Sequence, residues 1–168
     1  MAHLKCTKRL LARLDVTPAL AEPDPAPVLG DWFANVIPVW GGELIICLNE
    51  RSLLTVILPA SCTPALGASL RERVPILLRR LAAPSSFIVT VQGELEHVAI
   101  VKTDSRSMLS HLRDLSGFCE DAVDLQRFNK SREEAEMRLA DWLYGPSPYR
   151  SPIDLLREMI AAHEKTRS

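Results

Sequence analysis

Residues 32–48 read WFANVIPVWGGELIICL, and this stretch decides the fold. Its first half is β-branched and aromatic, its second half is almost wholly apolar, and Gly41-Gly42 between them is typical of a two-residue hairpin turn. A polar turn at 49–52 and an apolar run at 53–58 follow. The pattern predicts three strands in an antiparallel meander. Because the middle strand is apolar on both faces after Glu43, we expect other elements to cover both faces of the sheet.

The chain before the meander predicts a strand, a helix and a long connection. Residues 3–6 form the strand, Thr7 is an N-cap type, and leucines at helical spacing follow over 10–14. The connection at 16–30 contains four prolines, which favour an extended, polyproline-like chain. Pro38, in the first meander strand, lacks an N–H donor, so we expect that strand to lie at an edge or to carry a bulge.

The chain after the meander predicts mostly helices. Thr63 and Pro64 are typical of a helix start, and an apolar stripe at helical spacing continues to residue 81, with a kink or break expected at Pro75. Residues 86–95 fit either a strand or a helix, and residues 97–102 fit a strand.

The C-terminal part predicts three helices. The first spans 105–128, and Ser131 with Glu134 forms a capping-box sequence for the second, which should end near Tyr144. Ser151-Pro152 begins the third. We therefore predict an α+β fold: an antiparallel meander sheet with helices packed on it and a C-terminal helical pair. Residues 1–128 form the core domain, with a proline-rich loop at 16–30, and residues 129–168 form a helical extension packed on it.

Composition bounds the classes of function. The 168 residues are 47% apolar and 24% charged with a net charge of −1, which excludes affinity for nucleic acid or anionic membranes driven by bulk charge. No apolar run approaches the ~18 residues of a membrane span, and the N-terminus has no signal-peptide pattern. The four cysteines form no C-x-x-C pair, and no histidine pairs with them at ligand spacing. We expect reduced thiols in the cytoplasm, no metal and no cofactor.

Four sequence blocks carry a resemblance: CTKRLL at 6–11, WFANV at 32–36, LIICLNE at 44–50 and KTDSRS at 102–107. In this order they resemble a family of small bacterial domains of unknown function, and the resemblance covers most of residues 1–125. It implies a helix rather than a strand at 86–95. Family members tend to have Gly and Asn in the helix after Arg106, where this chain has Ser110 and Arg113. The resemblance supports the fold and brings no activity with it.

Two strand-to-helix turns are a candidate anion site. Each follows a short strand, at 4–6 and at 98–102, and opens a helix whose unpaired N–H groups attract anions. If the two strands are neighbours, both turns face one rim. The alternative is that the hydroxyls only cap helices, the cations are solvated, and Asp104 repels an anion or caps the helix itself. The candidate residues are Thr7, Lys8, Arg9, Lys102, Thr103, Ser105, Arg106 and Ser107.

A second candidate, a contact surface, consists of Trp32, Asn35 and Trp40. Strict strand alternation places both tryptophans on one face and Asn35 on the other. Exposed rings would stack on a base or a partner side chain, whereas buried rings belong to the core. The scarcity of aromatic residues in this chain favours the core.

A phosphate-contacting helix face and two kinds of catalytic pair are further candidates, and each rests on residue types alone. Arginines on the helix after Pro64 form either a phosphate-contacting face or a solvated one. No G-x-S-x-G, P-loop or H-E-x-x-H motif is present. The residues concerned are Arg71, Arg73, Arg79 and Arg80 for the helix face, Cys6 with His97 and Cys119 with His111 for a thiol–imidazole pair, and Glu94, Glu96, Asp121 and Asp124 for an acid pair.

The sequence therefore favours a cytoplasmic binding or interaction module, of an accessory or toxin–antitoxin type, with a protein partner or self-association and no membrane contact. The alternative is an enzyme or RNA-directed protein that acts on a phosphate-bearing ligand at the two turns. No catalytic residue is assigned. The alternative depends on one geometric condition, which is that residues 4–6 and 98–102 lie side by side.

Overall fold

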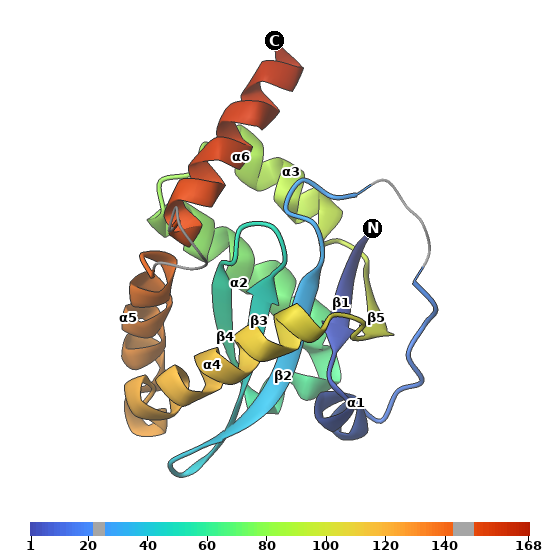
Figure 1. Ribbon diagram of the computed structural model, residues 1–168, viewed down its shortest axis with the longest axis vertical. Coiled ribbons are helices and arrows are strands. Elements are labelled where there is room, and N and C mark those ends of the chain that lie inside the picture. The colour runs from blue at the N-terminus through green and yellow to red at the C-terminus, as the bar shows by residue number, and fades with distance from the viewer. Residues whose placement is uncertain (22–25, 143–149) are drawn as a thin grey trace.

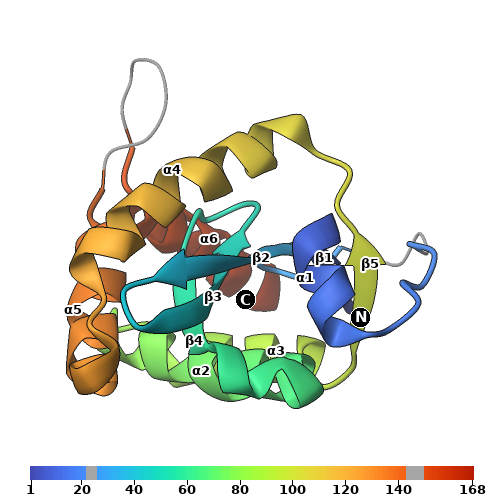
Figure 2. The same ribbon diagram turned by 90° about the horizontal axis from the view of Figure 1, so that it is seen from below.

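A five-stranded sheet with helices on both faces forms the body of the molecule (Figures 1 and 2). The computed structural model describes residues 1–21, 26–142 and 150–168. The strand order is β4-β3-β2-β1-β5. The elements are β1 (Ala2–Cys6), α1 (Lys8–Leu14), β2 (Trp32–Val39), β3 (Gly42–Asn49), β4 (Thr55–Pro59), the 3₁₀ helix η1 (Ala60–Ala65), α2 (Leu66–Arg80), α3 (Ser85–Glu94), β5 (Val98–Lys102), α4 (Arg106–Ala122), the 3₁₀ helix η2 (Leu125–Arg127), α5 (Phe128–Ala140) and α6 (Pro152–Arg167).

The sheet is mixed, so the prediction of a purely antiparallel sheet is wrong. Strands β2, β3 and β4 form the expected antiparallel meander. Strand β1, however, pairs in parallel with both β2 and β5. Each of these pairs is joined by a crossover rather than a hairpin, and a crossover is what parallel neighbours require. Strand β2 is interior and its register with β3 is continuous, so the prediction of an edge strand or a bulge at Pro38 is wrong. Pro38 is paired with Glu43 of β3 and lies beyond Ala34, the last residue of β2 that pairs with β1.

Two apolar cores lie on opposite faces of the sheet. Helices α2 and α3 cover one face, here called the α2 face, and α4 crosses the other, the α4 face (Figure 2). Strand β3 sends Ile45 and Cys47 into the first core and Leu44 and Ile46 into the second. The expectation that both faces of this strand are covered is confirmed.

Helices α2 and α3 correct or settle two predictions. Helix α2 runs without a break through Pro75, so a break at this residue is wrong, and a kink there stays a prediction. The helix begins at Leu66 because the 3₁₀ helix η1 precedes it. The Thr63 hydroxyl donates a hydrogen bond to the Ala60 carbonyl and does not cap α2. Residues Ser85–Glu94 are helical, as the resemblance implied.

The C-terminal helices differ from the prediction. Helix α4 ends at Ala122, and α5 already begins at Phe128, so Ser131 lies inside α5 and accepts a hydrogen bond from Asp124 N instead of forming a cap. The helical pair is not confirmed: α5 packs beside β4 and α4, whereas α6 reaches α3 through His163. The predicted end near Tyr144 lies outside the described residues. The capping box at Ser151 is present.

The described part of the proline-rich segment borders the sheet. Ala19 N donates to Ile100 O at 2.8 Å and forms a parallel bridge with Val101 of β5. Ala19 is therefore extended as expected, whereas Gly30 N donates to Pro27 O and closes a turn at 27–30, where the extended prediction is wrong. Residues 22–25 lie outside the described part. Of the helices in the described ranges, none has the length and apolar character needed to cross a membrane. The boundary between residues 128 and 129 stays a prediction.

Candidate functional site

Strands β1 and β5 are parallel neighbours, so the geometric condition set by the sequence is met. Cys6 is paired with Lys102, and Thr103, the first residue after β5, donates its backbone N–H to Cys6 O at 3.1 Å. On the other side, Thr7 N donates to Ala34 O of β2, also at 3.1 Å. The two turns, residues 7–9 and 103–107, therefore begin at one edge of the sheet. They are called the edge turns below.

The helices that follow the edge turns leave toward opposite faces. Leu10 of α1 is buried in the core on the α2 face, whereas Met108 and Leu112 of α4 are buried in the core on the α4 face. In open α/β sheets this divergence between adjacent parallel strands is a topological switch point, and ligands bind outside the carboxyl ends of the strands at such points. The edge turns occupy that position.

Hydroxyl and amide groups meet at the switch point. Thr7 Oγ1 accepts from Leu10 N at 3.3 Å, which caps α1, and donates to Asn35 Oδ1 at 2.7 Å. This bond fixes the Asn35 amide, whose NH₂ group has no partner within the described ranges. Thr103 Oγ1 is buried and has no hydrogen-bond partner among the described residues. Buried polar atoms are nearly always paired, so this hydroxyl is an exception that needs an explanation.

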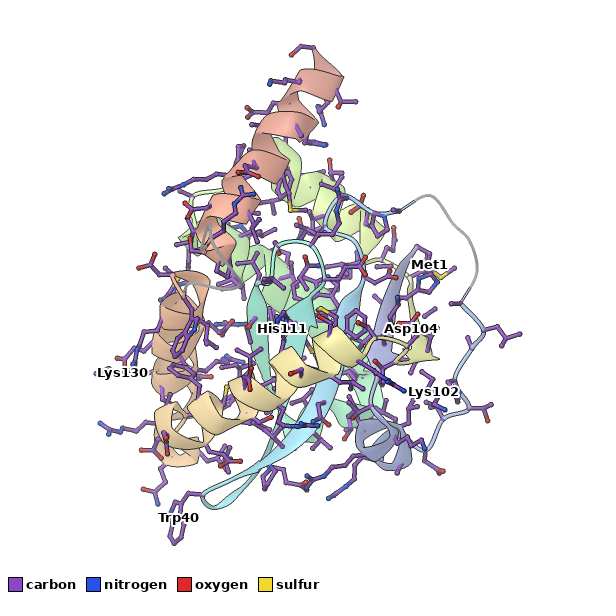
Figure 3. The ribbon with its side chains drawn as sticks, viewed as in Figure 1. Met1, Trp40, Lys102, Asp104, His111 and Lys130 are labelled. Atoms are coloured by element: carbon purple, nitrogen blue, oxygen red, sulfur yellow. The ribbon has the colours of Figure 1, made fainter. Side chains whose placement is uncertain are left out.

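The cations of the edge turns are exposed, and only some are paired. Arg9 lies 3.6 Å from a Glu43 oxygen on the β2–β3 hairpin, whereas Lys8, Lys102 and Arg106 have no ion-pair partner in the described part of the chain. Lys102 and Asp104 flank the start of α4 (Figure 3). The Asp104 carboxylate lies 3.4 Å from Lys5 Nζ, so its charge is partly offset.

The two serines of the second turn have different roles. Ser105 Oγ accepts from Met108 N at 3.3 Å and caps α4, as the simpler interpretation expected. Ser107 is exposed on the first turn of the helix. Only Ser105 therefore has an identified structural role.

A polar strip on the α4 face of β1 was missed by the sequence analysis. Lys5 Nζ lies 3.5 Å from an Asp31 oxygen and 5.1 Å from the centre of the Phe33 ring. His3 donates its backbone N–H to Asp31 Oδ1 at 3.0 Å, and its Nδ1 lies 3.2 Å from the same oxygen. The signal was present in AHLKCT at 2–7, where apolar and polar residues alternate.

The predicted contact surface does not form as a unit. Trp32 is 1% exposed and belongs to the core, so it offers no surface. Asn35 is tied to Thr7 at the edge turn. Trp40 is 89% exposed at the tip of the β2–β3 hairpin and points away from the body (Figure 3). The expected alternation fails because β2 ends at Val39 and Trp40 already belongs to the turn.

The arginine face is also divided. Arg73 is buried and donates from Nη2 to Glu136 Oε1 of α5 at 2.6 Å, so it is a packing residue. Arg80 lies 3.5 Å from Glu133, while Arg71 and Arg79 are exposed. The helix therefore presents no continuous face of free arginines.

The thiol–imidazole pairs considered from sequence are not assembled, whereas the acid pair stays a prediction. Cys6 pairs with Lys102, at the opposite end of β5 from His97, and Cys119 lies two turns along α4 from His111. Burial raises the pKa of Cys6 and of Cys119 to about 12, so neither thiol ionises near neutral pH. Burial also raises the pKa of Glu94, whose carboxylate accepts from Val28 N at 2.8 Å. Within the described ranges no three His, Cys, Asp or Glu side chains form a metal-holding group.

Fold and site together define a small α+β protein with a switch point between two parallel strands of a mixed sheet. A family model for a domain of unknown function, DUF6933, matches residues 3–155. The chain therefore belongs to the DUF6933 family. No curated protein matches it.

Proposed function

We propose that this protein binds a ligand through an anionic group, such as a phosphate, at the carboxyl edge of β1 and β5. The observation that carries the proposal is the parallel pairing of Cys6 with Lys102, followed by helices that diverge to opposite faces. This topology leaves the strand ends uncovered by either helix.

The chemistry of the edge turns supports an anionic group. Lys8, Lys102 and Arg106 supply positive charge from both sides of the edge, and the Asn35 amide supplies a fixed donor. Asp104 opposes an anion, but Lys5 lies against it. A ligand oxygen would also give the Thr103 hydroxyl the acceptor that it lacks.

The test uses inorganic pyrophosphate as the probe, titrated into ¹⁵N-labelled protein. We expect the amide signals of residues 103–107 and 8–9 to shift, and the Kd to rise about tenfold or more in the double variant Lys102→Ala/Arg106→Ala, because charge-assisted hydrogen bonds are lost. The matched control is Lys130→Ala/Arg167→Ala, which removes the same charge from exposed sites on α5 and α6. Equal weakening in both double variants, or shifts confined to other residues, would contradict the proposal.

The exposed Trp40 favours a second candidate function, self-association through the hairpin tip. A tryptophan with 89% of its surface in water contributes little to folding, and tryptophan is enriched among residues that dominate protein interfaces. Sedimentation equilibrium of the wild type and Trp40→Ala tests this candidate. A dimer that Trp40→Ala dissociates supports it, and identical monomeric behaviour of both proteins excludes it.

A further inference from the structure

A cavity lies where α5 packs beside β4. Strand β4 is at the edge of the sheet opposite β5 (Figure 1). Its volume is about 250 Å³, near the lower end for small-molecule sites. It is bounded by β4, η1, α2 and α5, and none of its lining residues belongs to the switch point. The lining residues are Leu58, Pro59, Cys62, Ser69, Glu72, Arg73, Ile76 and Arg132.

One wall of the cavity carries two guanidinium groups that share one carboxylate. Arg73, 5% exposed, holds the fully buried Glu136 with Nε at 3.1 Å and Nη2 at 2.6 Å. Arg132 lies 3.9 Å from the same Glu136 oxygen, too far for a hydrogen bond. Glu133 is shared between Arg80 and Arg73, at 3.5 and 4.0 Å. Three guanidiniums thus face two carboxylates.

Arg132 is the least satisfied member of this group. Its Nε is buried without a hydrogen-bond partner among the described residues, and its Nη2 donates only to Asn129 at 3.1 Å. Burial and the neighbouring charge of Arg73 lower the pKa of Arg132, while Glu136 and Glu133 raise it, and the guanidinium lies 4.8 Å from the centre of the Phe128 ring. A carboxylate in the cavity would relieve this repulsion, and guanidinium groups bind carboxylates with matched geometry.

The rest of the cavity is amphipathic. Leu58, Pro59 and Ile76 supply apolar surface, and Ile76 is 39% exposed. Glu72, also in the lining, is exposed and has no ion-pair partner in the described ranges. A bound carboxylate alone would leave Glu72 unused, whereas a ligand that also carries an ammonium group would satisfy both ends.

We infer that this cavity binds a small zwitterion of the α-amino-acid type with an apolar side chain. Its carboxylate contacts Arg132 and Arg73, its ammonium contacts Glu72, and its side chain packs on Leu58, Pro59 and Ile76. This inference is independent of the proposed function, because the two sites share no residue.

Cys62 provides a direct readout. It is the partly exposed thiol in the cavity lining, whereas Cys6, Cys47 and Cys119 are buried. We expect L-leucine to slow the reaction of Cys62 with iodoacetamide in the folded protein. The two probes that each lack one charge, 4-methylpentanoate and 3-methylbutylamine, should protect Cys62 more weakly than leucine does.

Two variants locate the contacts. Arg132→Gln should raise the apparent Kd of leucine about tenfold, as expected for hydrogen bonds to a charged group, and should leave protection by the amine unchanged. Glu72→Gln, on the exposed side, should raise the Kd roughly two- to fivefold and remove the preference for leucine over 4-methylpentanoate. Lys130→Gln, on the same helix as Arg132, is the charge control and should bind as the wild type does.

The outcomes separate cleanly. Thermal melting first establishes that Arg132→Gln is folded, and Glu72→Gln carries the test if it is not. Absence of protection by leucine in the wild type, or equal protection in wild type and Glu72→Gln, would overturn the inference. Protection by 4-methylpentanoate as strong as by leucine would also overturn it, since the site would then bind a carboxylate and not a zwitterion.

Discussion

On the α2 face the apolar core extends from β4 to β1, whereas on the α4 face the core under α4 reaches only to β2, with Val101 of β5 buried separately beyond β1. Leu4 and Cys6 of β1 are buried in the first core together with residues of β2, β3 and β4. On the opposite face of the same strand stand His3, Lys5 and Thr7, and α4 packs on β2 and β3 instead. The antiparallel half is therefore closed on both faces, while the parallel half is closed on one.

This difference places a buried ion pair in one half of the sheet and partly exposed charged groups in the other. In the closed half the Glu136 carboxylate is buried and is held by Arg73. In the open half Lys5 lies between Asp31 and Asp104, and the Asp104 side chain is 65% exposed. Functional groups concentrate where a rigid scaffold leaves polar side chains near water. The predictions below test this contrast.

Among substitutions of charged residues, the largest effect is expected from Glu136→Ala. Removing this carboxylate leaves Arg73 charged in a site that is 5% exposed, and we expect a loss of about 3 kcal/mol in the free energy of unfolding. This loss is at the lower end of the range for breaking a buried ion pair, because Glu133 lies 4.0 Å from Arg73 and still pairs with it in the variant. Urea denaturation measures it.

Two further variants define the contrast. Glu134→Ala, an exposed residue on the same helix, should change the free energy by no more than about 0.5 kcal/mol. Asp104→Ala, which removes the exposed partner of Lys5, should cost about 1 kcal/mol or less. If Asp104→Ala proved as costly as Glu136→Ala, the two halves of the sheet would not differ in the way described.

The second prediction concerns the free energy of unfolding at alkaline pH. It tests whether the α2 face is closed to water in both halves of the sheet. Burial raises the pKa of Cys6 to about 12 and that of Cys47 well above its ordinary value. An unfolded thiol ionises near pH 8.5, so above that pH the unfolded state holds fewer protons than the folded state. The stability contributed by the protonated Cys6 thiol is present below about pH 8.5 and is lost as the pH rises toward 12, by about 1.4 kcal/mol per pH unit. Cys47 acts in the same direction.

Single substitutions isolate each thiol. Between about pH 9 and 11 the free energy of unfolding falls as the pH rises. Cys6→Ala in β1 and Cys47→Ala in β3 should each make this fall less steep, by the contribution of the one thiol that is removed. Cys62→Ala, at a partly exposed thiol, should reduce it less. An unchanged slope in Cys6→Ala alone would show that water reaches the α2 face of the parallel half.

The sequence predicted the closed half better than the open half. Periodicity and the Gly41-Gly42 turn suffice for the meander, because each of its strands pairs with the next along the chain. The parallel pairing of β1 follows from contacts between residues some 96 positions apart, Cys6 and Lys102, which no local pattern records. The edge turns could be proposed from their hydroxyl and basic residues, but Asn35 joins them only through the register of β2, and Asp31 approaches Lys5 only after β1 and β2 are aligned.

The smallest effect is expected from Trp40→Ala, which compares two tryptophans of one strand region. Trp32, 1% exposed, fills the core, and its replacement by Ala should cost about 3–5 kcal/mol. Trp40, 89% exposed beyond the end of β2, should change the unfolding free energy by no more than about 0.5 kcal/mol. Urea denaturation of both variants measures the difference. A loss above 1 kcal/mol in Trp40→Ala would mean that the hairpin tip packs on the body, for example on Leu125, which approaches Gly42. An unchanged free energy of unfolding in Trp40→Ala would show that this ring does not stabilise the fold. The hairpin tip would then resemble the open side of β1, because both present side chains that do not stabilise the fold.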